Sequence, residues 1–350
     1  MKPFAAAQRA LSEGIKGGAF PAAVVEVGHH DEVLWQESFG SLGTDPEDLP
    51  TPIDAVFDLA SLTKVLATTS ATMTAVDQQL LQLTDRVGRW LPEWRGDDRT
   101  AVTLADLLAH ASGLTPHMPF FRDCQGRAEF QHAICTMPLE YQPHHRSVYS
   151  DLGFILLGFI LEDVFGSSLD ATFQTMADRH SWGELRFRPP ARWRTRTAPT
   201  EIDTWRGRLL VGEVHDENAW ALGGVAGHSG MFGTAGAVGR FAQTILAGFK
   251  TQPTVARSAT FRQFTTRTDV PGSSRALGWD MMRLTSSCGT RMSPNAIGHT
   301  GFTGTSLWID PRLDAYVVLL TNRVHPTRTN DAILEIRPAF HDAVIGALDA

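Results

Sequence analysis

The chain contains the stretch Leu59-Ala60-Ser61-Leu62-Thr63-Lys64-Val65-Leu66-Ala67, at which its sequence pattern changes. The segment before this stretch favours β-strands, whereas the sequence from 59 to about 265 favours helices and loops. Asp58 can cap a helix that begins here, which would leave the backbone N–H of Ser61 unpaired. Ser61 and Lys64 are three residues apart, so a helix places both side chains on one face. The stretch therefore marks a structural boundary and offers a nucleophile beside a base.

Lys64 is unusual in this chain. The sequence holds only four lysines, against twenty-seven arginines, and Lys64 stands in an otherwise apolar and small run. Arginine stays protonated in a protein, whereas a desolvated lysine can become a neutral amine that accepts a proton. The S-x-x-K pattern is loose, and its ordinary alternative is a helix with a plain serine and a lysine whose stem covers apolar surface. A catalytic interpretation needs support from other motifs.

Strand-like segments lie at both ends of the chain. We expect an α+β fold in which an antiparallel sheet, built from the N- and C-terminal segments, is flanked by the terminal helices and interrupted by a mainly helical insertion. The sheet subdomain comprises 1–58 and 266–350, the helical subdomain comprises 59–265, and a site at their seam makes them one continuous catalytic unit. The predicted elements are helices over 3–17 and 329–349, with strands over 22–27, 32–38, 277–284, 296–300, 306–309 and 315–321.

Composition limits the partners and the compartment. The formal net charge of −7 disfavours nucleic acid and anionic membranes, because no cluster of Lys and Arg supplies phosphate contacts. No apolar run reaches the length of a membrane span, and the N-terminal residues do not resemble a secretory leader. The three cysteines fit no metal-ligand spacing and indicate reduced thiols. We therefore expect a cytoplasmic protein that acts on a small molecule, without a cofactor, a metal, or a nucleic-acid or membrane partner.

Two further motifs carry side chains suited to acyl transfer. Tyr149-Ser150-Asp151 opens a long apolar helix, and the Tyr149 phenol beside Lys64 can take the proton of Ser61 and return it to a leaving group. Gly298-His299-Thr300-Gly301-Phe302-Thr303-Gly304 is rich in glycine, which suits a strand edge that a substrate backbone approaches closely. Backbone N–H groups of this segment can complete an oxyanion hole with that of Ser61. Taken alone, the first motif also fits a tyrosine that packs at a helix start, and the second also fits an ordinary strand.

In this order and with these flanks, the three motifs resemble those of the serine β-lactamase and penicillin-binding-protein superfamily, in which S-x-x-K, Y-x-N and K-T-G line one cleft. The resemblance covers nearly the whole chain and is strongest to the class C-like branch, which includes esterases and D-amino-acid peptidases. It implies hydrolysis through an acyl-enzyme. The residues that it implicates are Ser61, Lys64 and Tyr149 in catalysis, Ser61 and Phe302 in the oxyanion hole, and His299, Thr300, Gly301 and Asp151 in substrate binding.

A longer block also resembles a subgroup of this superfamily. It reads Gly212-Glu213-Val214-His215-Asp216-Glu217-Asn218-Ala219, followed by a glycine-rich run over 222–232, and is similar to exo-acting amidases that cleave N-acetylmuramoyl-L-alanine amides during cell-wall turnover. The resemblance implies a muropeptide substrate and adds His215, Asp216, Glu217 and Asn218 to the candidate binding residues. A zinc site built from the same side chains is an alternative, but adjacent positions do not share a helix face as in H-E-x-x-H. A loop shaped by hydrogen bonds is the expected structure.

Two residues depart from the superfamily pattern. Asp151 stands where Asn is usual, and because an ionised Asp offers only acceptors, we expect it to face Lys64 or a substrate N–H. His299 stands where penicillin-recognising members have a lysine, whose permanent charge suits the carboxylate of a β-lactam. The expected function is an amidase acting on N-acetylmuramoyl peptides. The alternatives are a broad carboxylesterase or D-aminopeptidase with the same cleft, a β-lactamase, which both departures disfavour, and a non-catalytic ligand sensor.

Overall fold

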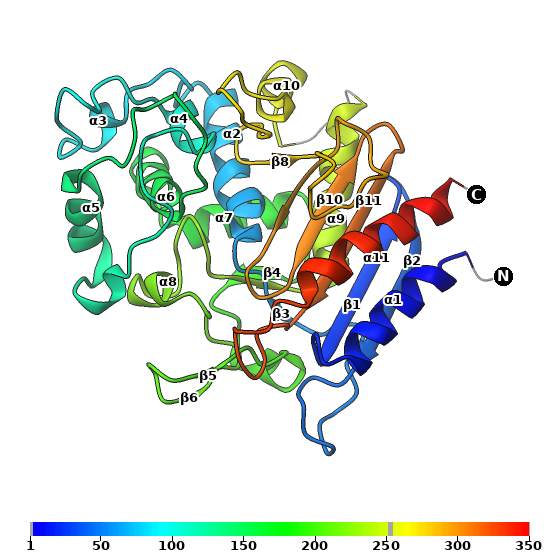
Figure 1. The fold of residues 1–350 in the computed structure, drawn as a ribbon. Helices are drawn as coiled ribbons and strands as arrows, with labels where there is room; N and C mark the ends of the chain where they lie inside the picture. Colours follow the sequence, from blue (N-terminus) through cyan, green and yellow to red (C-terminus); the bar gives the residue numbers. More distant parts are fainter. Residues whose placement is uncertain (1–2, 251–254, 350) are drawn as a thin grey trace.

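A six-stranded antiparallel sheet forms the centre of the protein in the computed structural model, which describes residues 3–250 and 255–349 (Figure 1). The strands lie in the spatial order β2-β1-β11-β10-β9-β8. Val25 of β1 pairs opposite Leu319 of β11, so the two ends of the chain lie side by side. The strands are β1 (Ala22–Gly28), β2 (Val33–Gly40), β8 (Asp280–Met281), β9 (Ile297–Thr300), β10 (Ser306–Asp310) and β11 (Ala315–Thr321).

Helices cover both faces of this sheet (Figure 1). Val25 and Leu319 belong to the core that the sheet shares with the two terminal helices. Val24 and Leu320, their neighbours in sequence, belong to the core on the opposite face. Because successive side chains of a strand point to opposite faces, apolar strands such as these need a layer on each side. The covering helices are α1 (Ala5–Lys16) and α11 (Ile333–Leu348) on one face and α9 (Ala235–Phe249) on the other.

A mainly helical region lies beside the sheet (Figure 1). At its centre is α6 (Asp151–Phe165), whose residues from Leu152 to Leu161 are all buried, which explains why this helix is apolar on every side. The other elements are the π-helical turn η1 (Lys64–Thr69), the helices α2 (Ser70–Asp77), α3 (Val87–Trp90), α4 (Leu104–Leu108), α5 (Gly126–Thr136), α7 (Leu169–Arg179), α8 (Glu217–Ala221) and α10 (Ser258–Thr265), the 3₁₀ turns η2 (Phe120–Arg122) and η3 (Ala191–Arg196), and the short strands β3 (Phe57–Asp58), β4 (Leu185–Phe187), β5 (Ile202–Asp203), β6 (Arg208–Leu209) and β7 (Met231–Gly233).

The predicted α+β architecture is confirmed, with local corrections. The strand predicted over 277–284 is wrong except at β8, because Gly278 has a φ of 84° and the N–H of Ala276 bonds to the Trp279 carbonyl in a tight turn. The C-terminal helix begins at Ile333 rather than near 329. Among residues 3–250 and 255–349, no single helix has both the length and the apolar composition to cross a membrane, and α6 and α7 meet these criteria only as a pair bent by 74°.

Candidate active site

Ser61 and Lys64 lie at the start of the helical segment that continues into α2. Lys64 Nζ donates a hydrogen bond to Ser61 Oγ at 2.9 Å. The same ammonium donates to Asp151 Oδ1 at 2.7 Å and to the His228 carbonyl at 3.1 Å. The side chain is fully buried, and these three hydrogen bonds fix its position. Asp151 was expected to face either Lys64 or a substrate N–H, and in the structure it bonds to Lys64.

A turn in the left-handed region presents Ser61. Ala60, directly before it, has a φ of 46°, a conformation that destabilises a non-glycine residue. Asp58 holds this turn, because its Oδ1 accepts the N–H of Ala60 at 2.8 Å and its Oδ2 accepts the N–H of His215 at 2.7 Å. The predicted role of Asp58 as a helix cap is therefore wrong, since the carboxylate bonds to the turn that precedes the helix. Burial raises the pKa of Asp58 despite these hydrogen bonds.

Tyr149 lies directly before α6, with its ring centre 4.9 Å from Lys64 Nζ. The ring of His110 is 4.7 Å away, and His110 Nδ1 accepts the N–H of Ser150 at 3.0 Å, so His110 fixes the backbone beside the tyrosine. Burial, together with the charges of Arg275 and Lys64, lowers the pKa of His110 well below its usual value and keeps it a neutral acceptor. Sequence reasoning missed His110, because an isolated histidine belongs to no motif.

Lys64 and Tyr149 form a coupled pair. Burial alone would lower the pKa of Lys64, but the Asp151 carboxylate and the Tyr149 phenol raise this pKa above its usual value. Burial raises the pKa of Tyr149, and this effect exceeds the opposing ones of the Lys64 charge and of hydrogen bonds to Lys64 and Ser61. The resting site at neutral pH therefore holds an ammonium and a neutral phenol. Burial by itself would favour the neutral amine that the sequence suggested for Lys64, but Asp151 and Tyr149 together outweigh this effect.

Gly301, in the middle of the third motif, lies against the segment that precedes Ser61. A Cβ at this position would lie 2.1 Å from Thr305 Oγ1 and 2.6 Å from the Leu59 carbonyl oxygen. The packing of the protein itself therefore requires glycine at this position. The sequence had suggested another reason, the close approach of a substrate to the strand edge. This close contact sets the distance between β9 and the nucleophile.

His299 is a neutral acceptor rather than a cation. Its Nδ1 donates to the Thr300 carbonyl at 2.8 Å. Burial, with the charges of Lys64 and Arg275, lowers the pKa of His299 well below its usual value. Within the described part of the chain, His299 Nε2 has no hydrogen-bond partner, and the residue lines the cleft at Ser61. The third motif thus lacks the permanent positive charge that a lysine would supply at this position.

Phe302 is the residue expected to offer the second N–H of an oxyanion hole. Its ring stacks on His215 with 5.7 Å between ring centres, and the Arg323 guanidinium lies 4.4 Å from the centre of the Phe302 ring. Arg323 Nε also donates to the Phe302 carbonyl at 2.8 Å. Among the residues that the structure describes, the backbone N–H groups of Ser61 and Phe302 donate no hydrogen bond, so both are available to an oxyanion.

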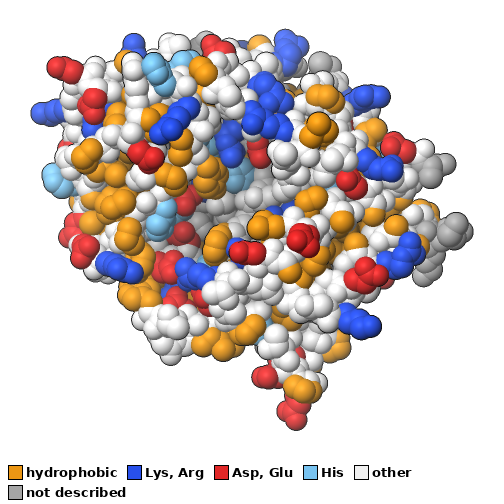
Figure 2. Space-filling model, in the orientation of Figure 1, with side chains coloured by type: hydrophobic (Ala, Val, Ile, Leu, Met, Phe, Trp, Pro, Cys, Tyr) orange, Lys and Arg blue, Asp and Glu red, His pale blue; other side chains and the backbone are white. Residues whose placement is uncertain are grey.

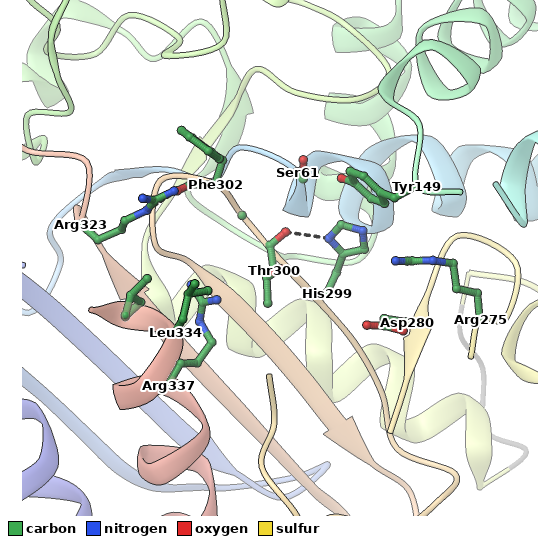
Figure 3. Close-up of a pocket in the computed structure, with 12 residues that line it drawn as sticks. Ser61, Tyr149, Arg275, Asp280, His299, Thr300, Phe302, Arg323, Leu334 and Arg337 are labelled. Carbon is green, nitrogen blue, oxygen red and sulfur yellow. Dashed lines mark hydrogen bonds between the residues drawn. The ribbon is translucent and has the colours of Figure 1, made fainter. Parts of the chain in front are cut away.

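A cleft of about 310 Å³ opens at Ser61 between β9 and α11 (Figure 3). The space-filling view shows this face of the molecule hollowed near its centre, with basic, acidic and hydrophobic side chains around the hollow (Figure 2). The predicted residues that line the cleft are Ser61, Tyr149, His299, Thr300, Gly301 and Phe302. Sequence reasoning missed the polar residues Arg275, Asp280, Arg323 and Arg337, which belong to no motif and are brought to the cleft only by the fold.

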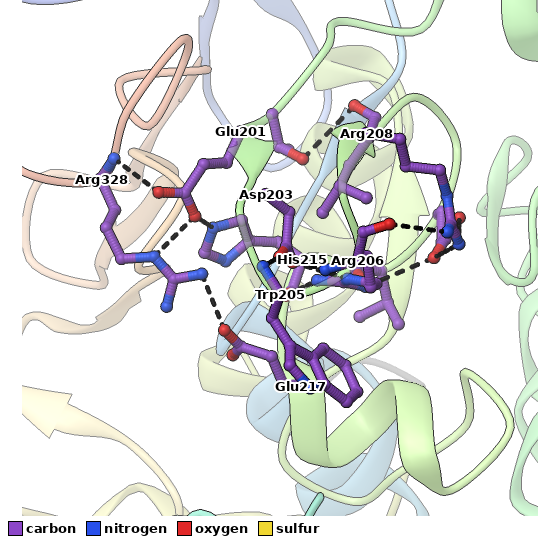
Figure 4. A network of polar contacts seen from close by, with 12 residues as sticks. Glu201, Asp203, Trp205, Arg206, Arg208, His215, Glu217 and Arg328 are labelled. Carbon is purple, nitrogen blue, oxygen red and sulfur yellow. Dashed lines mark hydrogen bonds and ion pairs between the residues drawn. The ribbon is translucent and has the colours of Figure 1, made fainter. Parts of the chain in front are cut away.

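The block over 212–219 lies beside this cleft and is tied to it by a polar network (Figure 4). His215 Nε2 lies 2.9 Å from Glu201 Oε2, which also accepts Arg328 Nε at 2.6 Å, and Arg328 Nη2 donates to Glu217 Oε1 at 2.8 Å. The hydrogen bonds from His215 and Arg328 hold the pKa of Glu201 at about 2, against the effect of burial. The network supports the ring of His215, on which Phe302 stacks.

Asp216 and Asn218 also bind protein groups. Asp216 Oδ1 accepts the N–H of Ala219 at 2.8 Å and lies 2.9 Å from His228 Nε2, while Asn218 Nδ2 donates to the Met118 carbonyl at 2.8 Å. The described lining of the cleft includes none of the four candidates from this block. Over the described ranges, no group of three or more His, Cys, Asp or Glu side chains is placed to hold a metal ion.

This fold and this Ser-Lys-Tyr site define a serine hydrolase. The chain belongs to the Beta-lactamase family, which matches residues 7–339. A relative from Escherichia coli strain K12, named "Putative D-alanyl-D-alanine carboxypeptidase", is 31% identical over 303 residues, or 77% of this chain and 69% of the relative.

Two solved structures are similar in fold over nearly their whole length. A class C beta lactamase from Rhodobacter sphaeroides has a TM-score of 0.78 and 19% identity, with 99% of each chain covered. EstCE1, a hydrolase with promiscuous acyltransferase activity, has a TM-score of 0.76 and 22% identity, with 97% of this chain and 99% of that chain covered. At these identities the likeness concerns the fold alone.

Proposed function

We propose that the protein is an amidase that hydrolyses the amide between the N-acetylmuramoyl group and L-alanine in muropeptides. One observation carries this proposal: the block that resembles exo-acting amidases contacts residues that adjoin the catalytic groups. His215 stacks on Phe302, and Asp216 binds His228, whose carbonyl accepts a hydrogen bond from Lys64. A subgroup-specific segment in this position can shape the acyl side of the site.

In the proposed mechanism Ser61 attacks the amide carbonyl, and its proton passes to the Lys64–Tyr149 pair. The N–H groups of Ser61 and Phe302 stabilise the oxyanion. Tyr149 then protonates the leaving amine, and a water molecule activated by the same pair releases the acid. The resting pair holds an ammonium and a neutral phenol, so it accepts the serine proton only after losing one of its own. The rate is therefore expected to rise with pH until the pair has lost that proton.

A second candidate is carboxypeptidase action on D-alanyl-D-alanine ends, which the name of the Escherichia coli relative favours. Both reactions cleave an amide and release an amino acid or peptide with a free carboxylate. They use the same catalytic residues and differ in the acyl group and in the configuration of the alanine at the leaving amine. Hydrolysis of simple esters remains the broader alternative, while the neutral His299 disfavours β-lactams, whose carboxylate suits a permanent cation at that position.

A substrate panel tests these candidates. The purified protein is incubated with N-acetylmuramoyl-L-alanine, an acylated peptide ending in D-alanyl-D-alanine, p-nitrophenyl butyrate and benzylpenicillin, and the products are quantified by mass spectrometry. Release of L-alanine as the fastest reaction supports the amidase. Release of D-alanine alone favours the carboxypeptidase, and turnover of the ester alone refutes both. Ser61→Ala is the matched control, and hydrolysis by this variant would contradict the proposed mechanism.

A further inference from the structure

A second groove, larger than the cleft at Ser61, lies beside the block over 212–219. Its volume is about 800 Å³, and Gly212, Glu213 and Val214 of the block belong to its lining. A volume of this size is typical of sites that bind small molecules. None of the described residues lines both the groove and the cleft, so the groove is a separate place on the protein.

Trp220 of α8 lines this groove and belongs to an exposed pair of tryptophans. Trp220 is 38% exposed, and its ring packs edge-to-face against that of Trp205, with 5.3 Å between ring centres. Trp205 is 44% exposed, and every other Phe, Trp or Tyr of the described ranges, apart from Phe302 in the cleft, is buried or half-buried. Two exposed indoles in contact form a continuous apolar patch, which indicates a binding surface.

Buried polar groups hold the exposed pair in place (Figure 4). Asp203 Oδ1 accepts the N–H of Trp205 at 2.7 Å, and Asp203 Oδ2 accepts Arg206 Nε at 2.6 Å. The Arg206 side chain is only 2% exposed and also donates to the carbonyls of Val214 and His215 at 2.7 and 2.6 Å. Because the indoles stand on a fixed base, a ligand that packs on them loses little of its binding energy to ordering the protein.

Part of the groove is lined by backbone alone, with polar side chains around it. Gly223 and Gly224 have φ values of 80° and 81°, which favour glycine, and a Cβ at Gly223 would meet no atom within 4 Å. Within the described residues, the side-chain amide of Gln125 has no hydrogen-bond partner. The Arg194 guanidinium donates to the Val211 carbonyl at 2.9 Å and keeps further N–H groups for a ligand.

Two residues of the lining connect the groove to the active site. Val214 precedes His215, whose ring stacks on Phe302, and Phe232 of β7 pairs with Asp58 of β3. Asp58 holds the turn before the nucleophile. Among the ligands that the groove could take, another part of the substrate itself is therefore the one most directly connected to the reaction.

An exposed indole, bare backbone and polar side chains together suit a pyranose ring. The C–H groups on one face of the sugar pack against an aromatic ring, while the hydroxyl and N-acetyl groups at its edge exchange hydrogen bonds with amides and charged groups. A purely apolar ligand would leave Gln125 and Arg194 desolvated without partners, and the Glu213 carboxylate disfavours a phosphate. Resting on the proposed function, we propose that the groove binds an N-acetylated amino-sugar ring of the muropeptide glycan, packed against Trp220.

Binding of N,N′-diacetylchitobiose tests the proposal, because this disaccharide contains two N-acetylated amino-sugar rings and no lactyl amide. Its titration into the wild type is followed by calorimetry and by tryptophan fluorescence. We expect saturable binding that is about tenfold weaker in Trp220→Ala and partly recovered in Trp220→Phe. Gln125→Ala, at the exposed edge of the groove, should also weaken binding. Leu284→Ala, at an exposed apolar residue outside the groove, is the matched control and should bind as the wild type does.

Absence of binding by the folded wild type would overturn the proposal, and so would equal affinities of the wild type and Trp220→Ala. Tighter binding of decanoate or of adenosine monophosphate than of the disaccharide would also overturn it, because the groove would then suit an apolar or an anionic ligand. The disaccharide has no bond for the amidase to cleave. Its binding without release of L-alanine in the substrate panel would refute the proposed function alone, and release of L-alanine without its binding would refute this inference alone.

Discussion

At the residue scale, the carboxylate of Asp151 favours the charged form of Lys64. An asparagine here would leave burial to lower the pKa of Lys64, whereas the carboxylate at 2.7 Å favours the ammonium. The same charge raises the pKa of Tyr149. Asp151 therefore raises the pKa of both Lys64 and Tyr149. The pair loses its first proton at a higher pH than it would beside the neutral amide of an asparagine.

Asp151→Asn is expected to move the ascending limb of the pH profile of kcat/KM to lower pH. Removal of the negative charge lowers the pKa of the cation Lys64 and also that of Tyr149, so the pair loses its proton at lower pH. The measurement is the pH dependence of kcat/KM on a neutral ester. Asp280→Asn is the matched control, because Asp280 lines the same cleft without contacting Lys64. An unchanged limb in Asp151→Asn, or an equal shift in the control, would show that Asp151 does not set this pKa.

Gly301→Ala is expected to reduce both stability and turnover. The new Cβ would lie 2.1 Å from Thr305 Oγ1 and 2.6 Å from the Leu59 carbonyl, so β9 and the segment before Ser61 must separate. Overpacking of this kind destabilises by roughly 1–3 kcal/mol. Thermal unfolding and kcat on an ester are the measurements, with Gly153→Ala as the control, since a Cβ there would be 3.6 Å from Leu107. Wild-type kcat in Gly301→Ala would refute the idea that this contact positions the oxyanion hole.

At the element scale, the block over 212–219 supports the loop that carries Phe302. The ring of His215 contacts Phe302, its imidazole bonds to Glu201, and its backbone N–H bonds to Asp58, which also holds the turn before Ser61. One residue thus connects the segments that carry the two N–H groups of the proposed oxyanion hole. This arrangement explains how a segment that does not line the cleft can still affect the reaction.

His215→Ala is expected to lower kcat by about tenfold with little change in KM, because a misplaced oxyanion donor weakens binding of the transition state more than of the substrate. His215→Phe keeps a ring against Phe302 and should recover part of kcat, although it cannot bond to Glu201. Steady-state kinetics on one neutral ester give both parameters. A rise in KM at constant kcat would instead indicate that His215 contacts the substrate directly, and identical losses in the two variants would exclude the stacking as the cause.

Features formed within one segment of the chain are predicted better from this sequence than features formed by the packing of distant segments. The runs of β1 and β11 are rich in Val and Leu, and they form the paired strands expected from them, whereas β8 is short because Gly278 turns the chain. Ser61 and Lys64 are recognisable because one helical turn joins them. Arg337 was not predictable, because its place in the site depends on the packing of α11 against the sheet. The raised pKa of Lys64 was missed for a related reason, since it depends on a contact between distant segments.

At the scale of the whole molecule, two buried carboxylates make opposite contributions to stability. Glu26 lies on β1, where burial raises its pKa even though Tyr316 donates a hydrogen bond to it at 2.9 Å. Glu201 is held by His215 and Arg328, and its pKa falls to about 2. A carboxyl group with a raised pKa favours the folded state at low pH, and one with a lowered pKa favours it above the pKa of the unfolded chain. The two groups should therefore respond to pH with opposite signs.

Glu26→Gln is expected to raise the melting temperature at pH 7, because the amide avoids burying a charge and still accepts from Tyr316, while the partly exposed Gln36 amide can turn to donate or accept. Glu201→Gln is expected to lower it, by a free energy on the order of 2 kcal/mol, since Arg328 and His215 lose their anion. Thermal unfolding of both variants and the wild type from pH 7 to pH 3 is the measurement.

The gain in Glu26→Gln should vanish as Glu26 becomes protonated in the wild type. The deficit in Glu201→Gln should persist down to 4.5, the ordinary pKa of a glutamate, and then shrink towards pH 2, where the native carboxylate is protonated. A deficit in Glu201→Gln that is constant over this whole range would mean that lost packing, and not the ion pairs, accounts for its effect.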